Sequence, residues 1–189
     1  ERLGEQVAAI RELNDGGRHK VRLLAGVECD ILKGGELDYE DDVLKDLDYV
    51  VVSIHQGGFG QDSATNTQRL VKALENPWVT ILAHPSGRLL LKREGYAFDL
   101  RKVVDAAHAN GKWIEINANP HRLDLDWRQW DYALEKGVLA CINPDAHETT
   151  GLHDVRHGIA MARKAGLPAD AVANTRPLKA FLELLAKTR

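Results

Sequence analysis

The sequence predicts an α/β fold in which helices cover a parallel sheet. Short, nearly all-apolar segments of strand length alternate with segments of helix length along the chain. Strands that are apolar on both faces are typical of buried parallel sheets. The alternation fits either an open doubly wound sheet or a barrel. With 189 residues, 44% of them hydrophobic, the chain has the size and apolar content of one domain with a substantial core.

Five apolar segments have the length and composition of buried strands. The clearest is Tyr49–Ile54, in which β-branched residues dominate. A turn around Gly34-Gly35 separates it from the first segment. The predicted strands cover residues 21–27, 49–54, 79–83, 113–116 and 138–142.

The segments around these strands carry apolar residues at helical spacing. Before the first strand, such residues recur every three or four positions: Leu3, Val7, Ile10 and Leu13. Stop signals such as Asn76-Pro77 and Asn110-Gly111 end two of the later helices. These later helices are predicted around residues 70–74, 100–107, 130–134, 152–159 and 178–185.

Composition excludes several classes of protein. No apolar run approaches the roughly 18 residues of a membrane span, so we expect a cytoplasmic protein without a membrane partner. The net charge of −3 argues against a polyanion binder that works by bulk charge. Cys29 and Cys141 have no C-x-x-C partner and are expected to be reduced, buried thiols. The first residue is Glu1 rather than Met, which suggests a fragment.

Polar residues, most of them of metal-ligating types, come at or near the end of each predicted strand: Glu28, His55, His84, Glu115-Ile116-Asn117 and Asp145-Ala146-His147. In a parallel α/β fold the carboxyl ends of the strands lie on one rim, so these side chains are expected to share one space. Mixed imidazole and carboxylate ligands suit zinc, manganese or iron. Two or more ions are expected, because carboxylates can bridge metals, and paired metals serve phosphoester hydrolysis. The predicted metal ligands are Glu28, His55, His84, Asp145 and His147.

Each of four other polar residues allows two interpretations. Arg88 and Arg122 can contact a phosphate, or each can form a surface salt bridge. Asn117 and Asn119 can orient ligands, or they can shape the turn before Pro120. The remaining histidines carry no such pattern and are expected on solvated surfaces: His19, His108, His121, His153 and His157.

Five motifs together resemble the PHP (polymerase and histidinol phosphatase) superfamily, above all the C-terminal PHP domain of bacterial family X DNA polymerases. The motifs are GVECDIL (26–32), SIH (53–55), AHPSGRLL (83–90), EINANP (115–120) and DAH (145–147), and NTRPL (174–178) extends the match. The resemblance implies a distorted (β/α)7 barrel with up to three zinc or manganese ions. It also implies phosphoesterase activity, in the polymerase-linked members a 3′-5′ exonuclease that processes DNA 3′ ends.

The resemblance also implies roles for single residues. Glu28 would bridge two metals, and His55 and His84 would complete one metal site. Asp145 and His147 would be catalytic and would bind another metal. Phosphate contacts would come from Arg88, Arg122 and Asn119. The implied mechanism is attack of a metal-bound hydroxide on phosphorus.

The sequence also departs from the family pattern. The family begins with an H-x-H strand, a following Asp and a second histidine motif, and none of these is present. We therefore expect residues 1–189 to be one PHP domain, a fragment from which about the first two β-α units are missing. Alternatively, the natural protein itself lacks these units. Such a chain would hold fewer ions than the complete domain. Its expected partners are upstream polymerase domains and DNA 3′ ends or another phosphoester.

Two alternatives stay open. One is a separate small-molecule phosphatase of the histidinol-phosphate type. The other is a non-catalytic PHP module that stabilises a polymerase, a class marked by the loss of metal ligands.

Overall fold

The computed structural model describes residues 2–17 and 20–189 and contains a five-stranded parallel sheet. The strand order is β1-β2-β3-β4-β5, so it follows the chain. The described residues therefore lack the reversal of strand order that defines a doubly wound sheet. The predicted α/β class is confirmed. The strands are β1 (Gly26–Asp30), β2 (Tyr49–Ser53), β3 (Ile81–Leu82), β4 (Trp113–Asn117) and β5 (Ala140–Asn143).

Helices connect and flank the strands. Two of them begin at an aspartate cap: Asp62 accepts a hydrogen bond from the Thr65 amide, and Asp99 accepts one from the Lys102 amide. Gly137, with a φ of 73°, ends a third helix in the left-handed conformation that glycine adopts easily. The helices are α1 (Arg2–Asp15), α2 (Asp41–Leu44), α3 (Ser63–Leu74), α4 (Leu100–Ala109), α5 (Asp131–Lys136), α6 (Val155–Lys164) and α7 (Leu178–Leu185).

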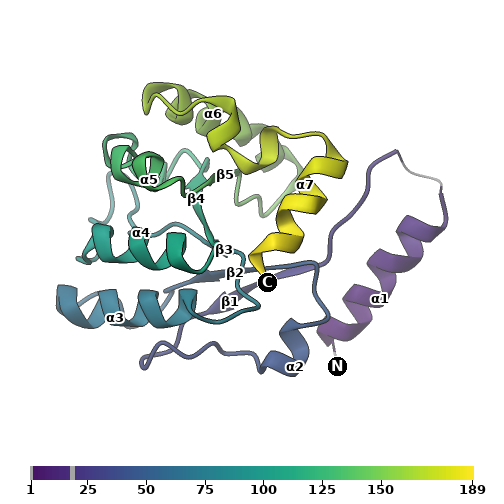
Figure 1. The fold of residues 1–189 in the computed structure, drawn as a ribbon, viewed down its shortest axis with the longest axis horizontal. Coiled ribbons are helices and arrows are strands. Elements are labelled where there is room, and N and C mark those ends of the chain that lie inside the picture. Colours follow the sequence, from purple (N-terminus) through teal and green to yellow (C-terminus); the bar gives the residue numbers. More distant parts are fainter. Residues whose placement is uncertain (1, 18–19) are drawn as a thin grey trace.

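The two faces of the sheet are covered differently. Side chains such as Val52, Leu82 and Ile116 belong to the main core, to which α3, α4, α5 and α6 contribute. Ile81 and Trp113 point to the other face and pack in a smaller cluster with residues of α7. Figure 1 shows α3 and α4 on one side of the strands and α7 on the other. The second face is therefore the more open one.

The first strand differs from its prediction. The apolar run 21–27 was expected to form it, but β1 covers Gly26–Asp30. Val21 is 68% exposed and Leu23 is 39% exposed, so the first half of the run does not enter the sheet. The ladder with β2 starts where Gly26 pairs with Tyr49. Consequently Glu28 lies in the middle of the strand and not at its end. The other four predicted strands overlap the observed ones.

Both cysteines are buried, and most of the other described histidines lie at the surface. Cys29 and Cys141 are free and buried, as expected. His108, His121 and His153 are exposed, whereas His19 lies outside the described residues. His157 is partly buried beside Asp154. Within the part of the chain that the structure describes, no helix is long and apolar enough to cross a membrane.

Candidate metal centre

Polar residues gather just beyond the carboxyl ends of the strands. His55, His84 and Asp145 each lie two residues after the last residue of their strand. His84 has a φ of 24° and Asp145 a φ of 51°, both in the left-handed region that disfavours residues other than glycine. Such costly backbone conformations persist where the surroundings enforce them, and they cluster at functional sites.

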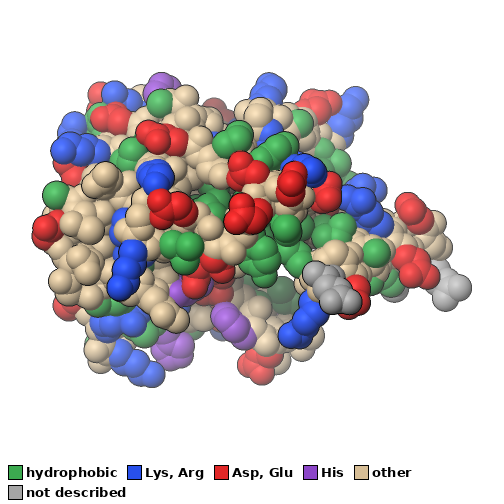
Figure 2. Space-filling model, turned by 90° about the horizontal axis from the view of Figure 1, so that it is seen from below, with side chains coloured by type: hydrophobic (Ala, Val, Ile, Leu, Met, Phe, Trp, Pro, Cys, Tyr) green, Lys and Arg blue, Asp and Glu red, His purple; other side chains and the backbone are tan. Residues whose placement is uncertain are grey.

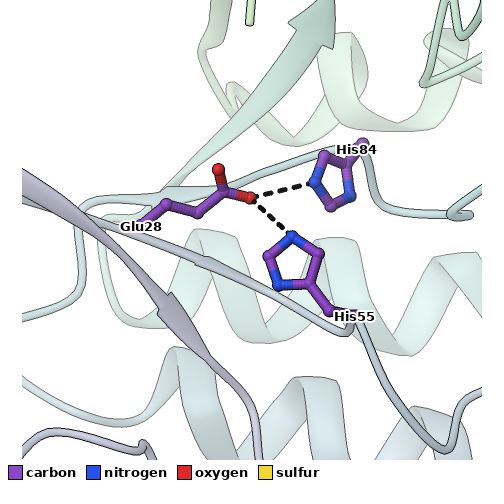
Figure 3. Close-up of side chains that lie close together, drawn as sticks. All are labelled: Glu28, His55 and His84. Atoms are coloured by element: carbon purple, nitrogen blue, oxygen red, sulfur yellow. Dashed lines mark hydrogen bonds and ion pairs between the residues drawn. The ribbon is translucent and has the colours of Figure 1, made fainter. Parts of the chain in front are cut away.

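Three of the predicted ligands form one cluster, shown in Figure 3. Oε1 of Glu28 lies 2.9 Å from Nε2 of His84 and 3.2 Å from Nε2 of His55. One ligand atom from each residue lies within 4.8 Å of the others. Among the residues that the structure describes, no further His, Cys, Asp or Glu joins this group. The His84 ring is buried, whereas Glu28 and His55 remain partly open to solvent.

Two neighbouring side chains support the cluster. The hydroxyl of Ser53 donates a hydrogen bond to Oε1 of Glu28 over 3.0 Å. Nδ1 of His55 contacts the carboxylate of Asp30, which leaves Nε2 directed at Glu28. A carboxylate on the far nitrogen of a histidine is typical of metal-binding imidazoles, because it fixes the ring and its tautomer. Neither Ser53 nor Asp30 is among the predicted site residues, although Asp30 follows Glu28 at the two-residue period that keeps strand residues on one face.

The electrostatics of the cluster favour a cation. Hydrogen bonds from His55 and His84 hold the pKa of the Glu28 carboxyl well below its usual range. The same contact with Glu28, together with Asp30, raises the pKa of His55 to about 9. A carboxylate therefore meets a protonated imidazole at neutral pH, and a metal ion binding there displaces that proton.

The donor set fits a transition metal. Two ligand atoms of a tetrahedral zinc ion lie about 3.4 Å apart. The two contacts of Glu28, 2.9 Å and 3.2 Å, are within a few tenths of an ångström of that separation. Two imidazoles with one carboxylate suit zinc or manganese better than magnesium or calcium. Glu28, His55 and His84 are thus a possible metal-binding group.

Asp145 lines a common cleft with Glu28 and His84. Its Oδ2 accepts a hydrogen bond from Nδ2 of Asn117 over 3.1 Å and faces Nε of Arg122 at 3.4 Å. His147 has an 84% exposed side chain, and its Nδ1 lies 2.9 Å from the backbone oxygen of Asp145. The structure thus brings three of the five predicted ligands into one cluster. His147 lies outside this cluster, with its Nδ1 3.8 Å from Oδ1 of Asp145.

The predicted phosphate-binding residues are held by protein groups. Arg88 contacts Oδ2 of Asp126 over 2.7 Å, the backbone oxygen of Arg122 over 2.9 Å and that of Leu123. These contacts engage all three guanidinium nitrogens. Asn119 is partly buried, and its side chain accepts the His121 amide. The assignment of Arg88, Arg122 and Asn119 to the substrate stays a prediction.

A cleft of about 530 Å³ runs from the metal-binding group along the open face of the sheet. Glu28, His84 and Asp145 line it, and Trp113 and Phe181 supply apolar lining. Figure 2 shows a face on which apolar side chains gather around a hollow, with acidic side chains and histidines at its border. The cleft therefore joins the metal-binding group to an apolar surface.

In the metal-free protein, we expect His55 to stabilise the fold at neutral pH and to lose this effect in alkali. Its pKa is raised from 6.5 to about 9, so the stabilisation is fully present below pH 6.5 and disappears as the pH rises through 9. Because the side chain is 41% exposed, solvent screening limits the effect to about 1 kcal/mol. Urea unfolding of the parent and the His55→Gln variant, with a chelator present, measures the difference in their free energies of unfolding below pH 6.5 and above pH 9.

Other groups titrate in the same range, including Lys112, whose pKa burial lowers to about 8. Their contributions cancel in the difference between the two proteins. A difference that persists unchanged above pH 9 would contradict the assigned role of His55.

The chain is similar to proteins of two kinds, although no protein-family model matches it. DNA polymerase/3′-5′ exonuclease PolX of Bacillus subtilis (strain 168) is 43% identical over 186 residues, which cover 97% of this chain and 32% of that protein. The match lies in a C-terminal portion of PolX. The chain therefore spans about a third of the length of this relative.

The second kind consists of proteins named as probable phosphatases. The one from Thermoanaerobacter sp. (strain X514) is 32% identical over 164 residues, which cover 82% of this chain and 64% of that protein. One from Shewanella sediminis (strain HAW-EB3) is 29% identical over 175 residues, which cover 88% of this chain and 68% of that protein.

Proposed function

Because the chain belongs to the PHP superfamily and is related to the PolX polymerases, we propose that it is a metal-dependent phosphoesterase domain that processes DNA 3′ ends. The observation that carries this proposal is the cluster of Glu28, His55 and His84 at the carboxyl ends of parallel strands. PolX is named as a 3′-5′ exonuclease as well as a polymerase, which favours a DNA substrate and polymerase domains as partners.

We further propose that the five strands are part of a distorted (β/α)7 barrel. Two features support this: the strand order follows the chain, and one face of the sheet is lined by a cleft. In this proposal residues 1–189 are one PHP domain, and additional β-α units of the natural protein would cover the open face. The complete domain would hold up to three zinc or manganese ions, and these residues alone would hold fewer.

In this proposal the clustered residues bind the metal, and their neighbours hold them in place. A divalent ion held by Glu28, His55 and His84 would polarise a phosphoryl oxygen and activate a water molecule for attack. Asp30 and Ser53 keep the His55 ring and the Glu28 carboxylate in place through the contacts described above.

Asp145 and His147 would act on the other side of the phosphate. The carboxylate of Asp145 would complete a second metal site and orient the attacking water. His147, exposed at the rim, would hold or release a proton close to the leaving 3′ oxygen. Arg122, whose Nε lies 3.4 Å from Asp145, would contact the phosphate, as would Arg88 and Asn119.

We expect the longest natural chain that contains these residues to shorten a 5′-labelled single-stranded DNA one nucleotide at a time in the presence of Mn²⁺. Removal of the metal with a chelator should stop the reaction. The Asp145→Ala variant should abolish it with little change in the circular dichroism spectrum, because Asp145 lies on the rim and outside the main core. Gel electrophoresis of the labelled products measures each effect.

The same assay separates the alternatives. Hydrolysis of histidinol phosphate without any cleavage of DNA would favour a small-molecule phosphatase. Several relatives are named as probable phosphatases. Metal binding without hydrolysis of either substrate would favour a non-catalytic module. Unchanged turnover in the Asp145→Ala variant would remove that residue from the site.

A further inference from the structure

Glu115 is a buried carboxylate in the middle of β4. It points to the same face of the sheet as Trp113 and lines the cleft, yet only 3% of the residue is exposed. It is not one of the clustered metal-binding residues. A charged group in such a position is costly unless hydrogen bonds compensate for the lost hydration.

Both oxygens of Glu115 are occupied by donors. Oε2 accepts the backbone amide of His84 over 2.6 Å and Nδ2 of Asn117 over 3.1 Å. Oε1 accepts Nδ2 of Asn143 over 2.9 Å. The Asn117 amide has a defined orientation, because its Oδ1 accepts the backbone amide of Asn119. The carboxylate thus links β4, β5 and the turn after β3.

The bond to His84 falls at the point where β3 leaves the sheet. The Ala83 amide still bonds to Val52 of the neighbouring strand, whereas the His84 amide turns to Glu115. His84 there adopts its positive φ of 24°, a conformation that residues other than glycine rarely keep without support. This conformation directs Nε2 of His84 at Glu28, 2.9 Å away.

We propose that Glu115 is a positioning residue for the metal centre, which acts by accepting the His84 amide and, through Asn117, by holding Asp145. Nδ2 of Asn117 donates both to Glu115 and to Asp145 over 3.1 Å each. The Glu115 carboxylate therefore positions two of the predicted ligands, His84 directly and Asp145 through Asn117. Because both oxygens of Glu115 are engaged by these donors, the proposal gives Glu115 no direct contact with metal. The inference rests on the metal-binding part of the proposed function.

Two variants separate the acceptor role of Glu115 from its charge. Glu115→Gln removes the charge but keeps an oxygen that can accept the His84 amide and Asn117, provided that Asn143 turns its own amide oxygen toward the new NH₂ group. Glu115→Leu removes charge and acceptor together. Asp48→Asn serves as the matched control, because Asp48 also accepts a backbone amide over 2.6 Å, from Ala25 just before the start of β1.

Mn²⁺ binding is measured by a titration that electron paramagnetic resonance monitors, on the longest natural chain. The values of kcat and KM are measured on the same proteins. We expect Glu115→Gln and Asp48→Asn to bind Mn²⁺ within about threefold of the parent, and Glu115→Leu to bind it about 10–100-fold more weakly. The loss should appear in kcat more than in KM. Equal weakening in both Glu115 variants, or parent-like binding in Glu115→Leu, would overturn the proposal.

If Glu115→Leu does not fold, a second measurement tests the proposal. Amide hydrogen exchange at His84 should be slow in the parent and in Glu115→Gln, because the carboxylate or the amide oxygen protects it. Exchange at His84 as fast as at the exposed Leu91 would overturn the inference. A parent protein that binds no Mn²⁺ would instead refute the metal site of the proposed function.

Discussion

Replacing His84 with alanine is expected to lower metal-dependent phosphoester hydrolysis at least about 10³-fold. His84 is the only buried member of the cluster in the described chain, and its Nε2 lies 2.9 Å from Glu28. Among the described residues, no further His, Cys, Asp or Glu belongs to the cluster and could take the place of His84 as a ligand. The loss should therefore persist at high Mn²⁺ concentrations. Initial rates on labelled DNA, measured over a range of Mn²⁺ concentrations, test this expectation.

Two controls distinguish a lost ligand from a lost fold. His84→Gln keeps most of the side-chain volume and should lose activity as well, with a smaller change in thermal midpoint than His84→Ala. His153→Ala removes a histidine that is exposed on a 3₁₀ turn and should leave the rate unchanged. Activity within tenfold of the parent in both His84 variants would show that the cluster is not the catalytic metal site.

The strand pattern was predictable because a buried parallel strand needs apolar residues on both faces. Tyr49–Ser53 satisfies this requirement, and β2 lies where the sequence analysis expected it. The run 21–27 is also mainly apolar, but its first residues have no partner strand beside them, since pairing starts at Gly26 and Tyr49. Apolar composition cannot show whether a neighbour is present, so the start of β1 was missed.

The cluster was predictable for a similar reason. Parallel strands place their carboxyl ends on one rim, so His55 and His84 could be assigned to one space before any geometry was known. The supporting residues were harder to find. Ser53 and Glu115 lie inside strands, where serine and glutamate have ordinary structural explanations, and their roles depend on distances between segments far apart in sequence. The exposure of His147 depends on the local backbone after Asp145, which residue type does not determine.

Metal binding should raise the stability of the protein by an amount that reports the site directly. A ligand that binds only the folded state stabilises it by about 2.7 kcal/mol at 100 times its dissociation constant. For a chain of this length such a change corresponds to a rise in thermal midpoint of roughly 5–10 °C. Glu28 contacts both histidines, so Glu28→Gln should remove most of this rise. Calorimetric scans with and without added metal measure it.

The size of the rise in thermal midpoint should depend on which metal ion is added. Two imidazoles and one carboxylate should bind zinc or manganese in preference to magnesium, because hard cations prefer sites made entirely of oxygen ligands. The rise in midpoint should therefore be large with Zn²⁺ or Mn²⁺ and small with Mg²⁺ at equal concentration. Zinc also binds cysteine and histidine in unfolded chains, which would reduce its effect, so manganese is the more decisive ion. An equal rise in the parent and in Glu28→Gln would assign the binding to another part of the molecule. The pair of His153 and His157 on neighbouring turns can then be tested by the same scans.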